Sequence, residues 1–180
     1  VPGYEVAPLS HYSGTYLTEN LVLLDRSTAD SATSELTVLD VSSSSPTPRQ
    51  VMLKPAKADL TGAQFGASAC LAVNPSRTTV YAMSNIYDGW TLVGNELKRI
   101  SLSAIVNAYQ TSTLLNWNTD AVAIGTSGSL EGGGVVGVSR NGDLYIGGFG
   151  GVQRVNPLTG SVIETIAPAG SFEYYGVAYN

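Results

Sequence analysis

Three copies of one strand-rich unit follow each other along the chain, and this repetition constrains the fold more than any single motif. Each copy begins with a turn, such as Asn141-Gly142-Asp143, and continues into a run of β-forming residues. The apolar residues alternate with a period of two, which is typical of strands rather than helices. The first strands are predicted at 21–25, 78–83 and 144–146, the second at 35–41, 96–102 and 151–156, and the third at 50–53, 121–125 and 161–166.

Segments rich in small residues precede two of these copies, at 67–73 and 134–139, and a similar segment lies at 175–179. Small side chains suit the innermost strands of sheets that crowd around a central channel. The predicted fold class is therefore all-β, a β-propeller with about three four-stranded blades. Closed rings have roughly four to eight blades, so we expect further chain, a second copy or another polypeptide to complete the ring.

The whole chain, 1–180, is interpreted as a single propeller segment in which the first unit lacks an inner strand. Two stretches exceed a compact blade and are predicted to be surface insertions, at 42–48 and at 103–118, the second with a short helix over 104–109. Because the chain begins at Val1, we expect a processed product, a fragment or a deliberately trimmed chain. The predicted blade units span about 16–57, 65–126 and 131–168, with the last inner strand at 174–180.

Charge and composition exclude several classes of partner. Hydrophobic residues make up 43% of the chain, charged residues 13%, and the formal net charge is -5. Nucleic-acid binding depends on clustered Lys and Arg, and here only Lys98 and Arg99 are adjacent, so neither nucleic acid nor an anionic membrane is an expected partner. The longest apolar run near the start, Leu21 to Leu24, is far too short to span a bilayer. A surface rich in Ser, Thr, Asn and Gly slightly favours an extracellular location, while the compartment stays open.

Familiar catalytic patterns are missing. Cys70 is the only cysteine, which excludes an intrachain disulfide and a thiolate metal cluster. His11 is the only histidine and has no Gly-x-Ser-x-Gly nucleophile elbow to serve, so a Ser-His-Asp triad is not expected. Gly132, Gly134 and Gly137 match the letters of a dinucleotide fingerprint, but a predicted strand follows them where that motif needs a helix.

The stretch 141–180 resembles a late blade of the senescence-marker protein, gluconolactonase and luciferin-regenerating superfamily, a group of six-bladed propellers. The similarity consists of a turn, Leu144-Tyr145-Ile146, a glycine-rich tight turn, Arg154-Val155, and an Asn-Pro-x-x-Gly sequence at 156–160. The stretch 71–102 is similar to the blade before it. The resemblance implies that the ring has six blades.

The resemblance also implies a divalent cation, usually calcium, held at the channel mouth by a Glu, an Asn and an Asp, where it polarises a lactone or ester carbonyl. The expected Asn and Asp fall on Ala69 and Gly134, which cannot ligate a metal. Glu131 is the nearest substitute for the second position, and Glu19 is the closest candidate for the third ligand. We therefore expect no cofactor, with calcium or another divalent cation as the alternative.

Three functions remain open. The preferred one is a non-metal module that binds a small molecule or a protein at the channel mouth, with Phe172, Tyr174 and Tyr175 as candidate ligand-binding residues because aromatic groups with polar tips often line such mouths. The second is a metal-dependent lactonase or esterase whose catalytic candidates are Glu131 and Glu173, with Asp88 or Asp120 in support.

The third function is structural, an extracellular scaffold assembled through blade edges. The end sheets of a half-propeller carry unpaired backbone groups, which seek partners. The expected partner is accordingly a second copy, giving a homodimer, or a chain that carries the remaining blades. Trp90 is interpreted as a loop anchor, and Trp117 is predicted to cover surface at a blade edge.

Overall fold

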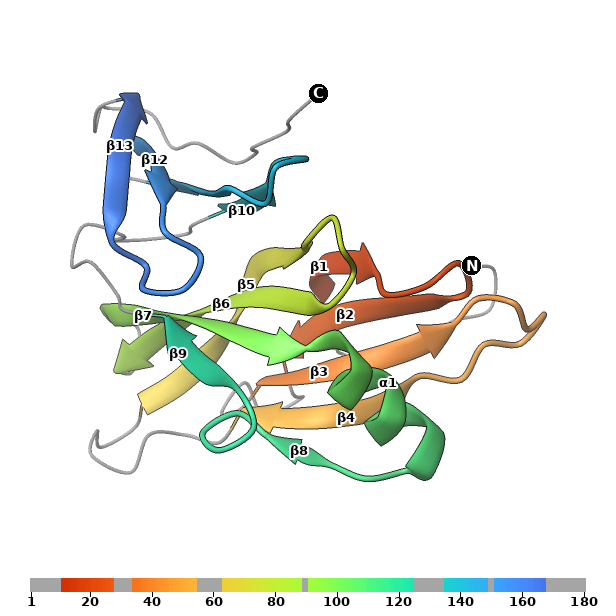
Figure 1. Cartoon of the computed structure of the whole chain (residues 1–180). Helices are drawn as coiled ribbons and strands as arrows, with labels where there is room; N and C mark the ends of the chain where they lie inside the picture. The colour runs from red at the N-terminus through yellow and green to blue at the C-terminus, as the bar shows by residue number, and fades with distance from the viewer. Residues whose placement is uncertain are drawn as a thin grey trace.

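A computed structural model of the chain describes residues 11–27, 34–54, 63–88, 91–124, 135–148 and 151–167. These residues form three sheets and one helix, α1 (Leu102–Thr111), so the predicted all-β class is confirmed. Figure 1 shows the sheets one after another in chain order, from β1 to β13. The expected last inner strand, at 174–180, lies outside the described residues.

Each sheet is a meander in which consecutive strands are antiparallel, and we call the three sheets blade 1, blade 2 and blade 3. Blade 1 contains β1 (His11–Tyr16), β2 (Leu21–Ser27), β3 (Ser34–Asp40) and β4 (Arg49–Lys54), with the short β8 (Leu115–Asn116) as a fifth strand. Blade 2 contains β5 (Ala63–Val73), β6 (Thr79–Asp88), β7 (Thr91–Ser101) and β9 (Val122–Ile124). Blade 3 contains β10 (Val135–Val138), β11 (Leu144–Gly148), β12 (Gly151–Val155) and β13 (Val162–Ala167).

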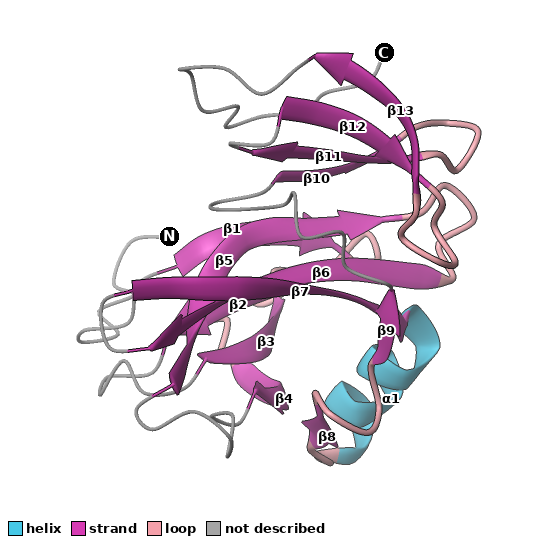
Figure 2. Ribbon diagram, turned by 90° about the vertical axis from the view of Figure 1, so that its left-hand side faces the viewer, coloured by secondary structure: helices cyan, strands magenta, loops and turns pink. Residues whose placement is uncertain are grey.

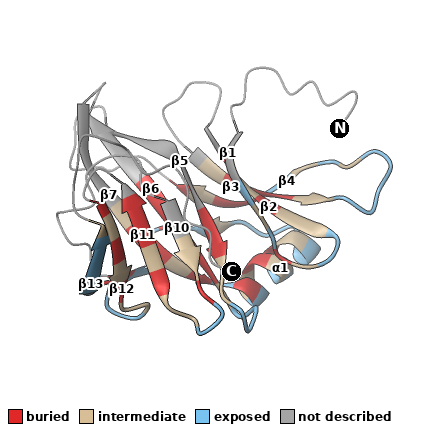
Figure 3. Cartoon of the chain, turned by 90° about the horizontal axis from the view of Figure 1, so that it is seen from above, coloured by how far each residue is buried: buried red, intermediate tan, exposed pale blue. Residues whose placement is uncertain are grey.

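Blade 2 is packed on both faces, and the alternation of residues along β6 shows how. Val80 and Ala82 belong to a buried cluster with blade 1 and α1, whereas Tyr81 and Met83 belong to a second cluster with blade 3. Successive side chains of a strand point to opposite faces, so one strand supplies both cores. Figure 3 shows this burial in β6 and β11.

The first strands of the three blades also lie together. β5 contacts β1 on one side and β10 on the other. Four-stranded meanders stacked face to face, with their first strands adjacent, are the arrangement of propeller blades. The structure therefore shows a propeller segment with three blades in its described part.

Two expectations about the first unit and the insertions were wrong in part. Blade 1 does have an inner strand, because β1 pairs antiparallel with β2 and starts before the expected unit boundary at 16. The segment 103–118 is more than a surface insertion, because it adds α1 and the parallel strand β8 to blade 1. Ser101 caps the start of α1, because its hydroxyl accepts a hydrogen bond from the Ala104 N–H, and Ser112 caps its end in the left-handed conformation.

Candidate functional site

The described connections that join neighbouring antiparallel strands within one blade lie at one end of the blades. In an antiparallel meander, the first and third connections share an end and the second lies at the other. The first and third connections of each blade are described, and we call the end that they form the turn face. Figure 2 shows loops of this kind, in pink, mostly on the side of the molecule where α1 lies.

Each of the six connections on the turn face begins with a short polar side chain that accepts a backbone N–H a few residues later. Such local hydrogen bonds hold a turn in one conformation. Three belong to inner turns and three to outer connections. The inner acceptors are Thr18, Asn74 and Ser139, and the outer acceptors are Asp40, Ser101 and Asn156.

The inner turns of blades 1 and 2 are joined directly. The Arg77 guanidinium donates a hydrogen bond of 3.2 Å to the Tyr16 carbonyl oxygen. The Tyr16 side chain is 59% exposed, and Arg140 is exposed on the inner turn of blade 3. Because the inner strands β1, β5 and β10 are adjacent, these three residues lie on the inner-strand side of the turn face, and we call them the mouth residues.

A group of charges is buried farther out, between blades 1 and 2. The Lys54 Nζ lies 2.6 Å from Asp25 Oδ2, and both side chains are fully buried. Lys98 Nζ donates to the Trp117 carbonyl oxygen at 2.9 Å and lies 3.5 Å from Glu96 Oε2. The two lysines and two carboxylates balance in charge, as a buried ionic group must if it is to be tolerated.

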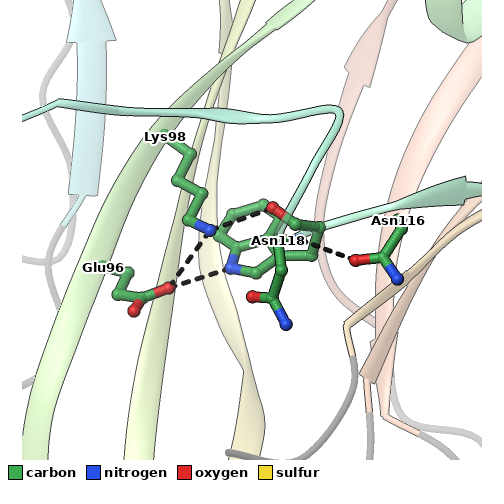
Figure 4. A network of polar contacts seen from close by, with 5 residues as sticks. Glu96, Lys98, Asn116 and Asn118 are labelled. Carbon is green, nitrogen blue, oxygen red and sulfur yellow. Dashed lines mark hydrogen bonds and ion pairs between the residues drawn. The ribbon is translucent and has the colours of Figure 1, made fainter.

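Trp117 is the centre of this group, and we call Trp117 with Asp25, Lys54, Glu96 and Lys98 the Trp117 cluster. Figure 4 shows Glu96 and Lys98 with the polar contacts around them. The Trp117 side chain is 0% exposed, and its Nε1 donates to Glu96 Oε2 at 3.0 Å. Both lysine ammonium groups lie 4.9 Å from the ring centroid, close enough for cation–π attraction. The expectation that Trp117 covers blade-edge surface was therefore wrong, because β8 brings the next residue in between the two blades.

The Trp117 cluster has the geometry of a structural core rather than of a reaction centre. Lys54 and Asp25 come from blade 1, Glu96 and Lys98 from blade 2, and the indole fills the space between them. One feature of the sequence pointed to this cluster. Lys98 and Ile100 are two residues apart on β7, so Lys98 lies on the same face of the strand as the buried Ile100.

Among the residues that the structure describes, Asp40 and Tyr81 have a shifted pKa. Hydrogen bonds from the Ser42 hydroxyl, and secondarily from its backbone N–H, hold the pKa of the Asp40 carboxyl below its usual value. Burial raises the pKa of the Tyr81 phenol, although the charge of Arg99 acts in the opposite direction.

Most site residues expected from the sequence fall outside the described residues. Glu131, Glu173, Phe172, Tyr174 and Tyr175 all do, so their roles stay predictions. Gly134 and Trp90 do as well.

The described candidates do not form a reaction centre together. Glu19 is exposed in the inner turn of blade 1. Asp120 is exposed and accepts a 2.7 Å hydrogen bond from the Asn116 N–H, which gives it a role in that turn. The backbones of His11, Ala69 and Asp88 lie in β1, β5 and β6.

In residues 11–167, outside the gaps given above, no three His, Cys, Asp or Glu side chains are placed to hold a metal ion together. No helix among these residues is both long and apolar enough to cross a bilayer.

No family model matches the chain, and no curated protein matches it either. Among solved structures it is similar to the C-terminal WD40 domain of Sif2, with 12% identity and a TM-score of 0.49. The similarity covers 87% of this chain and 38% of that chain, so this chain spans less than half of the matched protein. A likeness of this extent assigns no activity.

Proposed function

We propose that this chain is a non-metal propeller module that binds a protein partner through the mouth of the turn face. The observation that carries the proposal is the set of six connections, each held by its own side-chain acceptor. A surface that is already ordered before binding loses less conformational entropy when a partner docks. Such a surface suits recognition.

The composition of the mouth supports a protein partner. Tyrosine and arginine are the residue types that most often dominate the binding energy of protein interfaces. Tyr16 is mostly exposed, and its backbone is held by Arg77 from the neighbouring blade, while Arg140 adds a second cation. The two arginines favour an acidic patch on the partner, despite the net negative charge of the chain.

Affinity capture with the full chain, from an extract of its source organism, tests the proposal quantitatively. Tyr16→Ala and Arg140→Ala should each lower the affinity for a captured protein by about thirtyfold, which corresponds to a hot-spot loss of about 2 kcal/mol. Val122→Ser is the control, because Val122 is exposed on β9, away from the mouth. Equal recovery by the parent chain and all variants would contradict the proposal. Release of the captured protein from the chain by a stoichiometric amount of a small metabolite would also contradict it.

The lactonase alternative depends on Glu131 and Glu173, and the small-molecule alternative on Phe172, Tyr174 and Tyr175. Calorimetric titration with Ca²⁺ separates the first from our proposal. Tight, stoichiometric calcium binding together with calcium-dependent lactone hydrolysis would replace the non-metal module with the hydrolase. Substitution of Glu131 by Gln should then abolish both signals.

The scaffold alternative makes the mouth irrelevant and places the site of assembly at the blade edges. Native mass spectrometry of the full chain distinguishes it. A homodimer, or a stable complex with a chain carrying further blades, that survives Tyr16→Ala and Arg140→Ala supports assembly through the blades.

A further inference from the structure

The connection between β3 and β4 is a run of hydroxyl side chains that ends in two prolines. Four serines occupy positions 42–45, and Pro46, Thr47 and Pro48 follow them. The four serines and Thr47 are all exposed. Figure 1 shows this connection, in orange, extending beyond the strands at the margin of the molecule. An enzyme that modifies side chains can therefore reach it without opening the fold.

Three of these hydroxyls have no hydrogen-bond partner in the described part of the chain, namely those of Ser44, Ser45 and Thr47. The Ser42 hydroxyl is bonded to the carboxylate that begins the turn, and the Ser43 hydroxyl accepts a backbone N–H. Elsewhere on the turn face, exposed hydroxyls lie within hydrogen-bond distance of each other in the pairs Ser76 and Thr78, Ser101 and Ser103, and Thr159 and Ser161. The three unpaired hydroxyls are therefore available for reaction without breaking a contact of the fold.

The two prolines hold this segment in an extended conformation. A residue that precedes proline is driven out of the helical region and into extended backbone. Ser45 and Thr47 each precede a proline, and no other serine or threonine of the chain does so. Serine and threonine gathered with proline are typical of segments that carry O-linked sugar. The sequence and the exposure of this segment thus agree on the same chemistry.

We propose that Ser44, Ser45 and Thr47 carry O-linked sugar. In the transfer, a glycosidic bond forms between the side-chain oxygen and the anomeric carbon of a sugar, while the bond from that carbon to the phosphate of an activated glycosyl donor breaks. The phosphate leaves with the electron pair, and the hydroxyl proton passes to a base of the transferase. The connection joins the two outer strands of blade 1, so the proposal does not depend on the function proposed for the mouth.

Charge favours a neutral sugar over a phosphate at these hydroxyls. Arg49 is the only basic residue in the segment 40–49. Its guanidinium already donates to the Tyr109 carbonyl oxygen and lies 5.0 Å from the Tyr109 ring centroid. A phosphate would add about -1.5 to -2 charge near the Asp40 carboxylate, in a chain whose net charge is -5. A neutral sugar needs no such counter-charge.

A second run of exposed hydroxyls, Thr111, Ser112 and Thr113, provides a matched control within the same blade. The Thr111 hydroxyl donates to the Asn107 carbonyl oxygen at 2.8 Å and lies 3.0 Å from the Thr113 hydroxyl. Ser112 has a φ of 57°, which is left-handed rather than extended, and no proline follows these residues. We therefore expect this run to stay unmodified.

Mass spectrometry of the full chain expressed in its source organism tests the proposal. The intact mass should exceed that of the polypeptide by whole sugar units, and fragmentation should place these units at 44, 45 and 47. Alkaline β-elimination should remove them, as it does O-linked sugar. N-linked sugar does not contribute, because proline blocks the one Asn-x-Ser sequence of the chain, Asn74-Pro75-Ser76.

Two triple variants sharpen the test. The variant S44A/S45A/T47A should lose all of the O-linked mass, whereas T111A/S112A/T113A should keep it. All six side chains are exposed, so both variants should fold as the parent chain does. Replacement of both prolines by alanine, P46A/P48A, should lower the sugar-occupied fraction at positions 45 and 47, because the extended backbone is then no longer imposed.

Four outcomes overturn the proposal. The first is a chain that carries no sugar, and the second is sugar confined to residues outside 44–47. The third is phosphate in place of sugar on these hydroxyls, which would assign the segment to a kinase. The fourth is the same sugar content in P46A/P48A as in the parent chain, because the extended acceptor on which the proposal rests would then have no part in the modification.

Discussion

The outer edges of blade 1 and blade 3 are built from similar meanders and end in opposite ways. β4 is covered by β8 and contacted by α1, and the segment that follows β8 places Trp117 between the blades. β13 has no such neighbour among the described strands and exposes three aliphatic side chains. The comparison shows that one inserted segment, with α1, β8 and Trp117, is enough to bury the outer edge of blade 1. The ion pairs of the Trp117 cluster are part of that buried region.

Replacement of Trp117 by Ala should cause the largest loss of stability. Removal of a fully buried tryptophan costs about 3–5 kcal/mol, and here it also takes a hydrogen bond from Glu96 and the aromatic face from two lysines. Urea unfolding measures the change. Trp117→Phe keeps most of the apolar surface and should lose less, and equal stability of Trp117→Ala and the parent chain would contradict the central role of this side chain.

Lys54→Met should destabilise the protein by about 3–5 kcal/mol, because it leaves the carboxylate of Asp25 buried without its ammonium partner. The double variant with Asp25→Leu should recover most of that loss, since neither charge of the pair is then left buried without the other. Thermal unfolding of the two single variants and the double variant forms the cycle. A strictly additive cycle would show that the pair does not interact, and the first-blade edge would then owe its stability to apolar packing alone.

The two edges should respond differently to the same kind of substitution. Leu115→Ser on β8 should cost about 1 kcal/mol or more, because Leu115 packs against the buried cluster of blades 1 and 2. Ile166→Ser on β13 should change stability by no more than about 0.5 kcal/mol, because its side chain is about half exposed. Equal losses at the two positions would mean that the edge of β13 is covered in solution.

The smallest expected effect is a difference in pH dependence between the outer turns of blade 1 and blade 3. Asp40 begins the turn of blade 1 and Asn156 that of blade 3. The pKa of Asp40 is lowered in the folded chain, so the stability that its charge contributes is present above the unfolded value near 3.8 and is lost as pH falls through the lower folded pKa. NMR titration should show the Ser42 N–H signal moving in that acidic range, while the Leu158 N–H signal, held by an amide, stays constant.

Local features of the fold could be read from the sequence with good accuracy. The predicted strand at 35–41 is observed as β3 at Ser34–Asp40, and the predicted helix over 104–109 lies inside α1. These elements depend on alternation and on capping by neighbouring residues, which are visible in a short window. The inner strand β1 was missed because its sequence, HYSGTY, has little apolar alternation and owes its place to pairing with β2.

The arrangement of the candidate site could be predicted less well from the sequence than the fold. The polar residues that begin the turns were visible, but their arrangement on one face depends on how the blades stack. Tyr16 and Arg77 are far apart in the chain and meet only because β1 and β5 lie side by side. The aromatic and acidic candidates near the end of the chain lie outside the described residues and stay predictions.

The sequence by itself determined the all-β class, the repeating unit and most turns, because these follow from period-two alternation and from Asn, Gly and Ser at turn positions. Only the tertiary structure decided that Trp117 is interior, that Lys54 pairs with Asp25 and that β13 is exposed. The physical reason is that the burial of a residue depends on how the blades pack against each other. A charged or aromatic residue on a strand is compatible with either face, and the segment that packs against it is specified by contacts distant in the chain.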